Sequence, residues 1–385
     1  MYHSMPTYLD CAATTPLDAR VRDEMLRYFD GEFGNAGSRT HAWGQRARSA
    51  VEQARDRIAR AVNTTRGDVI FTSGATESNN LALLGLSSTD GRRHVVSTAM
   101  EHHAVLEPLT ELQRRGFEIT YVQPSCDGLA DADAIMAAIR PDTMLVSVMH
   151  VNNETGVIQP IREIAEQLPD SGPWLHVDAA QGFGSEFQTL THARIDLISI
   201  SAHKIHGPKG VGALIARKRN GHRPPLRPLM FGGGQERELR PGTLPVPLVA
   251  GFGLAAELAV IERDARAAAC RAFRDALLDG LSPLAPVING DPARSVPHII
   301  NLSIPGLDAE VAIDAWRDLV AISNGAACTS HSYTCSHVLS AMRLPAWRQA
   351  GALRFSWCAA TVAPQWPALV AAARPFIEST KERAQ

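Results

Sequence analysis

Short apolar runs alternate with segments of helical periodicity between residues 68 and 216, and this alternation constrains the fold more than any other feature. The runs lie at residues 69–72, 95–98, 117–122, 144–150, 174–177, 195–200 and 212–216. Strands that are separated by helices pair in parallel, and a parallel sheet is covered by helices on both faces. We therefore predict an α/β fold with a mostly parallel sheet, in which ligands lie beyond the carboxyl ends of the strands.

The composition argues against several classes of protein. The chain has 385 residues, of which 45% are hydrophobic and 20% are charged, and its net charge is −2. These values are typical of a globular protein with a large core, and no excess of basic charge indicates direct nucleic-acid binding. No apolar run is long enough to span a membrane, and the first residues lack the pattern of a signal peptide. We expect neither nucleic acid nor membrane as a direct partner.

The six cysteines are distributed along the chain, at positions 11, 126, 270, 328, 335 and 358. They are too few for a disulfide framework in a chain of this length, and no two of them form a C-x-x-C pair. We therefore expect mostly free thiols, at least one reactive thiol, and a cytoplasmic location.

The second half of the chain indicates a change of unit. Residues 219–247 are rich in Gly, Pro and Arg and predict a loop, whereas residues 248–278 predict one long helix. A smaller unit with its own strands and helices follows from about residue 296. The predicted units are residues 1–20, a segment contributing to the small domain, residues 21–250, the large cofactor-binding domain, and residues 251–385, the small α+β domain.

Three polar clusters follow apolar runs, at the edge where ligands are expected. Lys204 follows residues 195–200, and a lysine amine there can form a Schiff base once its pKa is lowered. Asp178 follows residues 174–177, and its carboxylate can face a cation such as a protonated pyridine nitrogen. Residues 74–76 form a turn into a helix, where backbone N–H groups favour a phosphate. Together they supply what a pyridoxal phosphate site needs, although singly each could be a solvated lysine or a helix cap.

Three further residues have side chains suited to catalysis or binding. His102 could stack its imidazole on a flat ring, or lie on the surface. Arg354 could clamp a carboxylate with two N–H groups, or form a surface ion pair. Cys328 lies in a loop of small and polar residues, where a thiol is accessible to a reaction partner. The same loop contains four possible zinc ligands, Cys328, His331, Cys335 and His337, but their spacing is more crowded than in structural zinc sites, and we expect no metal.

These clusters, in this order, resemble the cysteine desulfurases, the NifS/IscS-like branch of the class-V aminotransferases. The resemblance extends from Tyr8 to Arg354, which is nearly the whole chain. Its specific motifs are Phe71-Thr72-Ser73-Gly74-Ala75-Thr76-Glu77-Ser78-Asn79, Met149-His150-Val151-Asn152-Asn153-Glu154, His176-Val177-Asp178-Ala179-Ala180-Gln181, Ser201-Ala202-His203-Lys204 and Arg240-Pro241-Gly242-Thr243. The resemblance implies a pyridoxal phosphate-dependent transferase of fold type I, with a seven-stranded sheet in the large domain.

The resemblance also implies a role for each candidate residue. Lys204 carries pyridoxal 5'-phosphate, Asp178 pairs with the pyridine nitrogen, and Gln181 pairs with the ring hydroxyl. His102 stacks on the ring and belongs, with Lys204 and Cys328, to the catalytic residues. The positions implied to hold the cofactor are Ala75, Thr76, His102, Asn153, Asp178, Gln181, Ser201, His203, Lys204 and Thr243.

The implied reaction converts L-cysteine to L-alanine and leaves a persulfide on Cys328, for transfer to an acceptor protein. Asn153 and Arg354 match the positions that contact the substrate carboxylate. Thr243 matches a position that reaches the phosphate of a partner subunit, which implies a homodimer. Iron–sulfur assembly, tRNA thiolation and DNA phosphorothioation all remain open as the destination of the sulfur.

The chain departs from the family pattern in two places. After Ser356 the family usually continues towards Gly-Arg, but this chain has Trp357-Cys358-Ala359-Ala360. The loop of Cys328 also contains Cys335, which could receive sulfur or be inert. Two other functions stay open: another class-V enzyme, such as a selenocysteine lyase or an aminotransferase, and an inactive scaffold that binds sulfur-carrier proteins.

Overall fold

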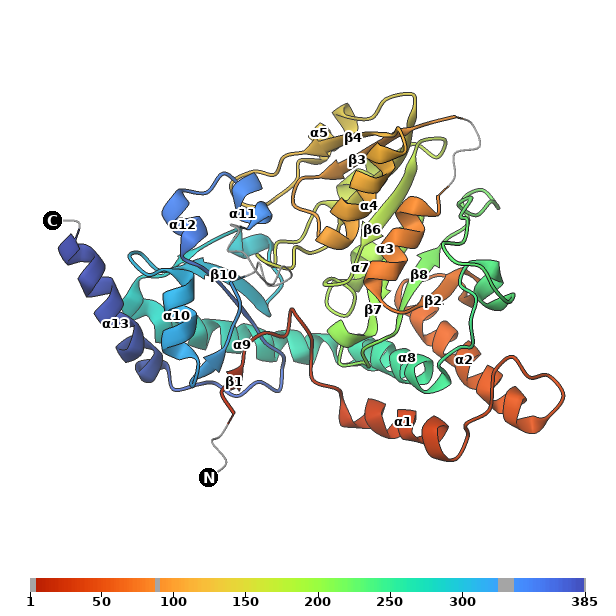
Figure 1. Cartoon of the computed structure of the whole chain (residues 1–385), viewed down its shortest axis with the longest axis horizontal. Coiled ribbons are helices and arrows are strands. Elements are labelled where there is room, and N and C mark those ends of the chain that lie inside the picture. Colours follow the sequence, from red (N-terminus) through yellow and green to blue (C-terminus); the bar gives the residue numbers. More distant parts are fainter. Residues whose placement is uncertain (1–4, 87–90, 325–335, 384–385) are drawn as a thin grey trace.

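A seven-stranded sheet forms the centre of the computed structural model, which describes residues 5–86, 91–324 and 336–383 (Figure 1). In spatial order its strands are β2 (Val69–Thr72), β8 (Gly212–Ala216), β7 (Leu197–Ser201), β6 (Trp174–Asp178), β5 (Thr143–Met149), β3 (His94–Thr98) and β4 (Glu118–Val122). The five strands from β7 to β4 are parallel, and β8 is antiparallel to both β7 and β2. The prediction of a mostly parallel sheet is confirmed.

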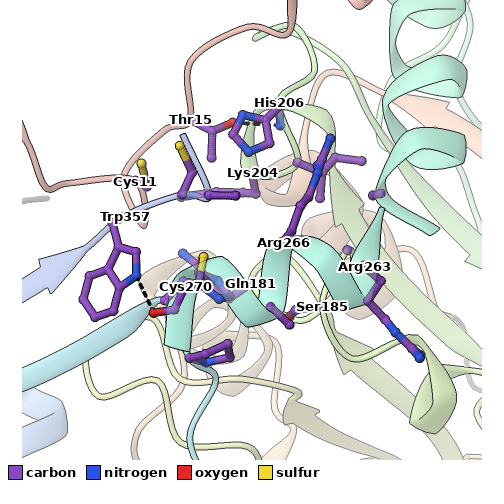
Figure 2. Close-up of a pocket in the computed structure, with 18 of the residues that line it drawn as sticks. Cys11, Thr15, Gln181, Ser185, Lys204, His206, Arg263, Arg266, Cys270 and Trp357 are labelled. Atoms are coloured by element: carbon purple, nitrogen blue, oxygen red, sulfur yellow. Dashed lines mark hydrogen bonds between the residues drawn. The ribbon is translucent and has the colours of Figure 1, made fainter. Parts of the chain in front are cut away.

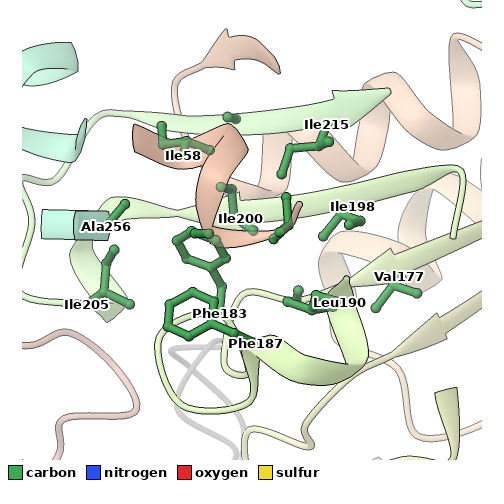
Figure 3. Close-up of a cluster of buried hydrophobic side chains, with 14 of the residues drawn as sticks. Ile58, Val177, Phe183, Phe187, Leu190, Ile198, Ile200, Ile205, Ile215 and Ala256 are labelled. Atoms are coloured by element: carbon green, nitrogen blue, oxygen red, sulfur yellow. The ribbon is translucent and has the colours of Figure 1, made fainter. Parts of the chain in front are cut away.

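Helices cover both faces of this sheet, as the alternating pattern predicts. They are α1 (Ala19–Asp30), α2 (Ala42–Ala61), α3 (Ala75–Leu84), α4 (His103–Arg114), α5 (Ala132–Ala137), α6 (Ile161–Gln167), α7 (Phe187–Leu190) and α8 (Val246–Ile261). Helices α2 and α8 pack on one face through a large apolar core, whereas α3 and α4 contribute to separate clusters with other strand residues. Figure 3 shows Ile58 of α2 and Ala256 of α8 beside Ile198 and Ile200 of β7.

The long helix predicted for residues 248–278 is instead two helices. Helix α8 ends at Ile261, and α9 (Arg263–Leu281) begins directly after Glu262. The two helices serve different cores, because α8 packs with the large sheet and α9 packs with the C-terminal strands. Glu262 lies between the two helices, and its carboxylate forms ion pairs with Arg20 and Arg266.

The C-terminal part contains a smaller antiparallel sheet. Its strands are β12 (Ala352–Ser356), β10 (Ile299–Ser303) and β9 (Val287–Ile288), and its helices are α10 (Ala309–Trp316), α11 (His337–Ala341), α12 (Ala346–Ala350) and α13 (Trp366–Arg383). Near the N-terminus, β1 (Thr7–Tyr8) pairs in parallel with β11 (Val320–Ala321), and Leu9 belongs to the C-terminal core. The division at residue 250 lies within α8, and the three domain boundaries stay a prediction.

None of the helices in the described ranges is both long and apolar enough to cross a membrane.

Candidate active site

A cavity of about 710 Å³ opens at the carboxyl ends of β5, β6 and β7, the edge at which the sequence predicts a ligand. The predicted site residues that line it are Ala75, Thr76, His102, Asn153, Asp178, Gln181, Ser201, His203, Lys204 and Arg354. Thr243 lies outside this cavity and is exposed. Cys328 lies outside the described residues, as do Cys335 and His331.

Lys204 ends a short 3₁₀ turn, Ala202–Lys204, that follows β7 directly. Its Nζ donates hydrogen bonds to the backbone carbonyls of Ala12 and Ala13, the latter at 3.0 Å. The side-chain amide of Gln181 donates to the same Ala12 carbonyl at 2.8 Å. A small-residue turn near the N-terminus therefore orients two of the predicted site residues. The sequence analysis assigned no role to this turn.

Asp178 is the last residue of β6, and two N–H donors hold its carboxylate. The side-chain amide of Asn79 donates to Oδ2 at 2.7 Å, and the backbone N–H of Ala180 donates to Oδ1 at 3.0 Å. Because Asp178 is only 5% exposed, these bonds leave its carboxylate fixed at the wall of the cavity. Asn79 is a second residue that sequence reasoning quoted in a motif without giving it a role.

His102 presents a neutral imidazole to the same cavity. It is the N-cap of α4, and its Nδ1 accepts the backbone N–H of Ala104 at 3.0 Å. Burial lowers the pKa of His102, and the positive charge of Lys204 lowers it further, while Asp178 opposes the shift. In the neutral ring the proton therefore lies on Nε2.

The N-terminus of α3 lines one end of the cavity. Ala75 and Thr76 are in its first turn, where backbone N–H groups and the helix dipole favour a negative group. The Ser201 hydroxyl lies close to Gly74: a Cβ atom added to this glycine would be 3.7 Å from the hydroxyl oxygen. Lys209 also lines the cavity and adds positive charge, a contribution that sequence reasoning missed.

His203 stands beside this end in its neutral form. Its Nδ1 is 3.2 Å from the hydroxyl of Thr14. Burial lowers the pKa of His203 to about 4, and the charges of Lys204 and Lys209 act in the same direction. The ring is therefore uncharged at neutral pH and acts through hydrogen bonds.

Arg354 brings the smaller sheet into the site. This residue of β12 is 4% exposed, and its Nη2 forms an ion pair with Asp10 at 2.7 Å. Its Nη1 donates to the backbone carbonyl of Asn153 at 3.1 Å, while its buried Nε has no partner among the described residues. Arg354 is thus a fixed cation at the cavity rather than a member of a surface ion pair.

The first residues of α11 contact the strand ends of the large sheet. Ser336 donates a hydrogen bond to a carboxylate oxygen of Glu154 at 2.6 Å. The Nε2 of His337 lies 2.8 Å from the backbone carbonyl of Glu101, and its ring packs at 4.8 Å from that of His103. These contacts hold the chain that follows Cys335 next to His102. They also give His337 a packing role, and no cluster of three metal-ligating side chains exists among the residues that the structure describes.

Comparison with known proteins places the chain among relatives of similar length. The family model for class-V aminotransferases matches residues 7–363. Cysteine desulfurase IscS from Anaeromyxobacter dehalogenans is 46% identical over 343 residues, which are 88% of this chain and 84% of that protein. The solved structure of DndA from Streptomyces lividans is 50% identical with a TM-score of 0.80, and covers 93% of this chain and 100% of its own. The structure of SspA in complex with cysteine is 32% identical with a TM-score of 0.81, and covers 92% and 100%.

Proposed function

The chain belongs to the class-V aminotransferase family, and we propose that it is a pyridoxal phosphate-dependent cysteine desulfurase. The enzyme converts L-cysteine to L-alanine and leaves the sulfur as a persulfide on Cys328. One observation carries the proposal: Lys204, Asp178 and Arg354, from distant parts of the chain, line a single cavity. An amine, an oriented carboxylate and a carboxylate-binding cation are the groups this reaction needs.

The residues around the cavity fit pyridoxal phosphate. The cofactor, when bound, draws electrons from the α-carbon of the substrate amine. Lys204 would hold it through Nζ, and Asp178 would face its ring nitrogen with a carboxylate that two N–H donors already orient. The neutral imidazole of His102 would stack on its ring. Its phosphate would lie at the N-terminus of α3, near Ala75, Thr76, Ser201 and His203.

Lys204 and His102 are the proposed proton-moving groups. The Nζ of Lys204 would take the α-proton of the substrate, and the carbonyls of Ala12 and Ala13 would orient the resulting ammonium group. The Nε2 of His102 carries a proton that a substrate atom can receive. Gln181, held by the Ala12 carbonyl, would contact the ring hydroxyl of the cofactor.

Arg354 and Asn153 are the proposed contacts of the substrate carboxylate. The buried Nε of Arg354 has no partner in the part of the chain that the structure describes, which supports this role because a carboxylate can accept its hydrogen bond. The thiolate of Cys328 would then attack the substrate sulfur, so that the sulfur–sulfur bond forms as the carbon–sulfur bond breaks. Cys328 comes to this proposal from its motif alone.

We propose a homodimer in which Thr243 contacts the cofactor phosphate of the partner subunit. Its exposure, outside its own subunit's cavity, is consistent with such a contact. The loop before it also exposes apolar side chains, of which Phe231 is 89% exposed, and such side chains usually pack against another surface. The sulfur acceptor is a protein, and iron–sulfur assembly, tRNA thiolation and DNA phosphorothioation remain the candidate destinations.

Two variants test the proposal on the purified full-length protein. Lys204→Ala should lose the yellow absorbance of the lysine-bound cofactor, and a retained absorbance would contradict the role of Lys204. Cys328→Ser should keep that absorbance but lose persulfide, measured by cyanolysis after addition of L-cysteine. Full alanine production by Cys328→Ser would instead favour a lyase, whereas conversion of L-cysteine to its 2-oxo acid without alanine would favour an aminotransferase. A wild-type protein that neither contains nor takes up the cofactor would favour the inactive scaffold.

A further inference from the structure

A second, smaller cavity of about 80 Å³ lies beside the first, and Lys204 and Gln181 line both. Three cysteines from distant parts of the chain line the smaller cavity: Cys11, Cys270 and Cys358. Figure 2 shows Cys11 and Cys270 around this space together with Lys204. None of these thiols has a part in the proposed desulfurase reaction.

Cys358 is the most accessible thiol of this cluster. It is partly exposed, whereas Cys11 and Cys270 are buried. It follows β12 in a tight turn, in which its backbone N–H donates to the Thr361 hydroxyl at 3.0 Å and its Sγ lies 3.5 Å from that hydroxyl. The turn therefore directs a hydrogen-bond donor at the sulfur.

The neighbours of Cys358 stabilise its thiolate. Cys11 and Cys358 line the same small cavity, and the neighbouring Cys11 thiol, together with the Thr361 hydroxyl and the Ala360 N–H, lowers the pKa of Cys358 to about 5. The same thiol–thiol contact raises the pKa of Cys11, so Cys11 keeps its proton. At neutral pH the pair is one thiolate and one thiol in contact, which is the arrangement that thiol oxidation requires.

The backbone holds these two cysteines together. The N–H of Cys11 donates to the Ser356 carbonyl at 3.0 Å, and the N–H of Ala12 donates to the Ser356 hydroxyl at 2.8 Å. Asp10 and Ser356 also form a parallel bridge. These bonds hold the segment of Cys11 against the end of β12, two residues before Cys358. Metal binding does not explain the cluster, since the described part of the chain has no group of three potential ligands arranged around one ion.

We propose that Cys358 and Cys11 form a reversible thiol-modification site, which a hydroperoxide oxidises to a disulfide. The Cys358 thiolate attacks one peroxide oxygen, the oxygen–oxygen bond breaks, and hydroxide leaves; Cys358 becomes a sulfenic acid. The Cys11 sulfur then attacks the Cys358 sulfur, the sulfur–oxygen bond breaks, and water leaves. In total, hydrogen peroxide takes two electrons and two protons from the two thiols and becomes two waters.

The disulfide would form one residue away from the groups that orient Lys204. Cys11 precedes Ala12, whose carbonyl accepts hydrogen bonds from both Lys204 and Gln181. Cys358 lies two residues after Ser356, which is the last residue of β12, the strand that contains Arg354. The site is therefore coupled by main-chain bonds to both sides of the larger cavity.

Peptide mapping of the full-length protein tests the proposal without any measurement of activity. Trypsin places Cys11 in residues 1–20 and Cys358 in residues 355–381, and neither peptide contains another cysteine. After hydrogen peroxide and alkylation of the remaining thiols, we expect these two peptides to be linked, with a mass two hydrogens below their sum. Dithiothreitol should release them. The exposed Cys126, the single cysteine in residues 116–162, is the internal control and should stay alkylatable longer.

Three variants distinguish the proposed pair from the alternatives. Cys11→Ser should abolish the linked peptide and let dimedone trap Cys358 as a sulfenic acid. A second variant, Cys11→Ala, removes the donor altogether and should move the midpoint of Cys358 alkylation by iodoacetamide upward from about pH 5. Cys270→Ser should leave the linkage intact. A link between Cys358 and Cys270, or oxidation of Cys126 before Cys358 in the wild type, would overturn the proposal.

Discussion

One buried ion pair anchors the loop that precedes Thr243 to the large sheet. Glu236 lies in the 3₁₀ turn Gln235–Glu238, and its carboxylate contacts the guanidinium of Arg55 in α2 through two nitrogens, one at 2.8 Å. The same carboxylate accepts the backbone N–H of Phe71 at 2.7 Å. The side chains of Arg55 and Glu236 are only 6% and 1% exposed. Glu236→Gln therefore removes one charge from a buried pair while it keeps nearly the same shape.

The expected cost follows from this burial. Glu236→Gln leaves the buried charge of Arg55 with only the partly exposed Glu52 as a partner, and removal of one partner of a buried ion pair costs about 3–5 kcal/mol. The entropy of unfolding is about 2.1 cal/mol/K per residue, which gives about 0.8 kcal/mol/K for 385 residues. The melting temperature of Glu236→Gln should therefore fall by about 4–6 °C.

Differential scanning calorimetry of the purified protein measures this shift, and Glu52→Gln is the matched control. Glu52 contacts the same arginine, at 3.1 Å from its Nε, but its side chain is 37% exposed. An exposed pair contributes about 0–1 kcal/mol, so the control should change the melting temperature by about 1 °C at most. If both variants shift it equally, burial does not determine the strength of this pair and the reasoning is wrong.

Two further predictions concern the cavity, and a third concerns the buried carboxyl group of Glu101. Arg354→Lys should lower kcat/KM for L-cysteine by about 10–100-fold, because it removes charge-assisted hydrogen bonds of about 1.5–3 kcal/mol; an unchanged value in alanine-production assays would exclude Arg354 as the carboxylate contact. Asp178→Asn should lower activity by about 10²–10³-fold and reduce the cofactor retained per subunit, because a buried cation would lose its anion; full retention in absorbance spectra would contradict the pairing. Burial raises the pKa of Glu101 to about 8, so the folded protein binds a proton that the unfolded chain releases above its ordinary pKa. The stabilisation that this proton gives is present in acid and is lost as the pH rises towards 8, by up to about 1.4 kcal/mol per pH unit. Urea unfolding measures it as the difference in free energy of unfolding between wild type and Glu101→Gln. That difference should change with pH at this slope, and a constant difference would contradict the prediction.

Much of the cavity could be predicted because its residues follow apolar strands. Asp178 ends β6, and Lys204 follows β7 after a short turn. Since β6 and β7 are parallel neighbours, their carboxyl ends meet at one edge, and polar residues placed there must come together. The alternation of apolar runs with helical segments is therefore enough to predict that Asp178 and Lys204 lie at one site, without knowledge of any side-chain contact.

Other parts of the site leave no such signal in the sequence. The acceptors of Lys204 are the backbone carbonyls of Ala12 and Ala13, which any residue type would supply. The pair of Asp10 with Arg354 joins residues 344 positions apart, and either charge alone is typical of a protein surface. Such contacts depend on the tertiary fold, so periodicity and local motifs cannot reveal them.

The turn at Ala12 connects the two sheets, and this explains why so short a segment affects the whole site. Its carbonyl orients Lys204 and Gln181 at the large sheet, while its N–H is bonded to Ser356 of β12 in the smaller sheet. Arg354 lies two residues before Ser356 in the same strand. A displacement of β12 relative to the large sheet must therefore move the substrate-binding cation and the acceptors of the lysine together. Substrate binding and the orientation of Lys204 are therefore coupled through the turn at Ala12 and strand β12. A bond between Cys11 and Cys358 would join this turn to the end of that strand.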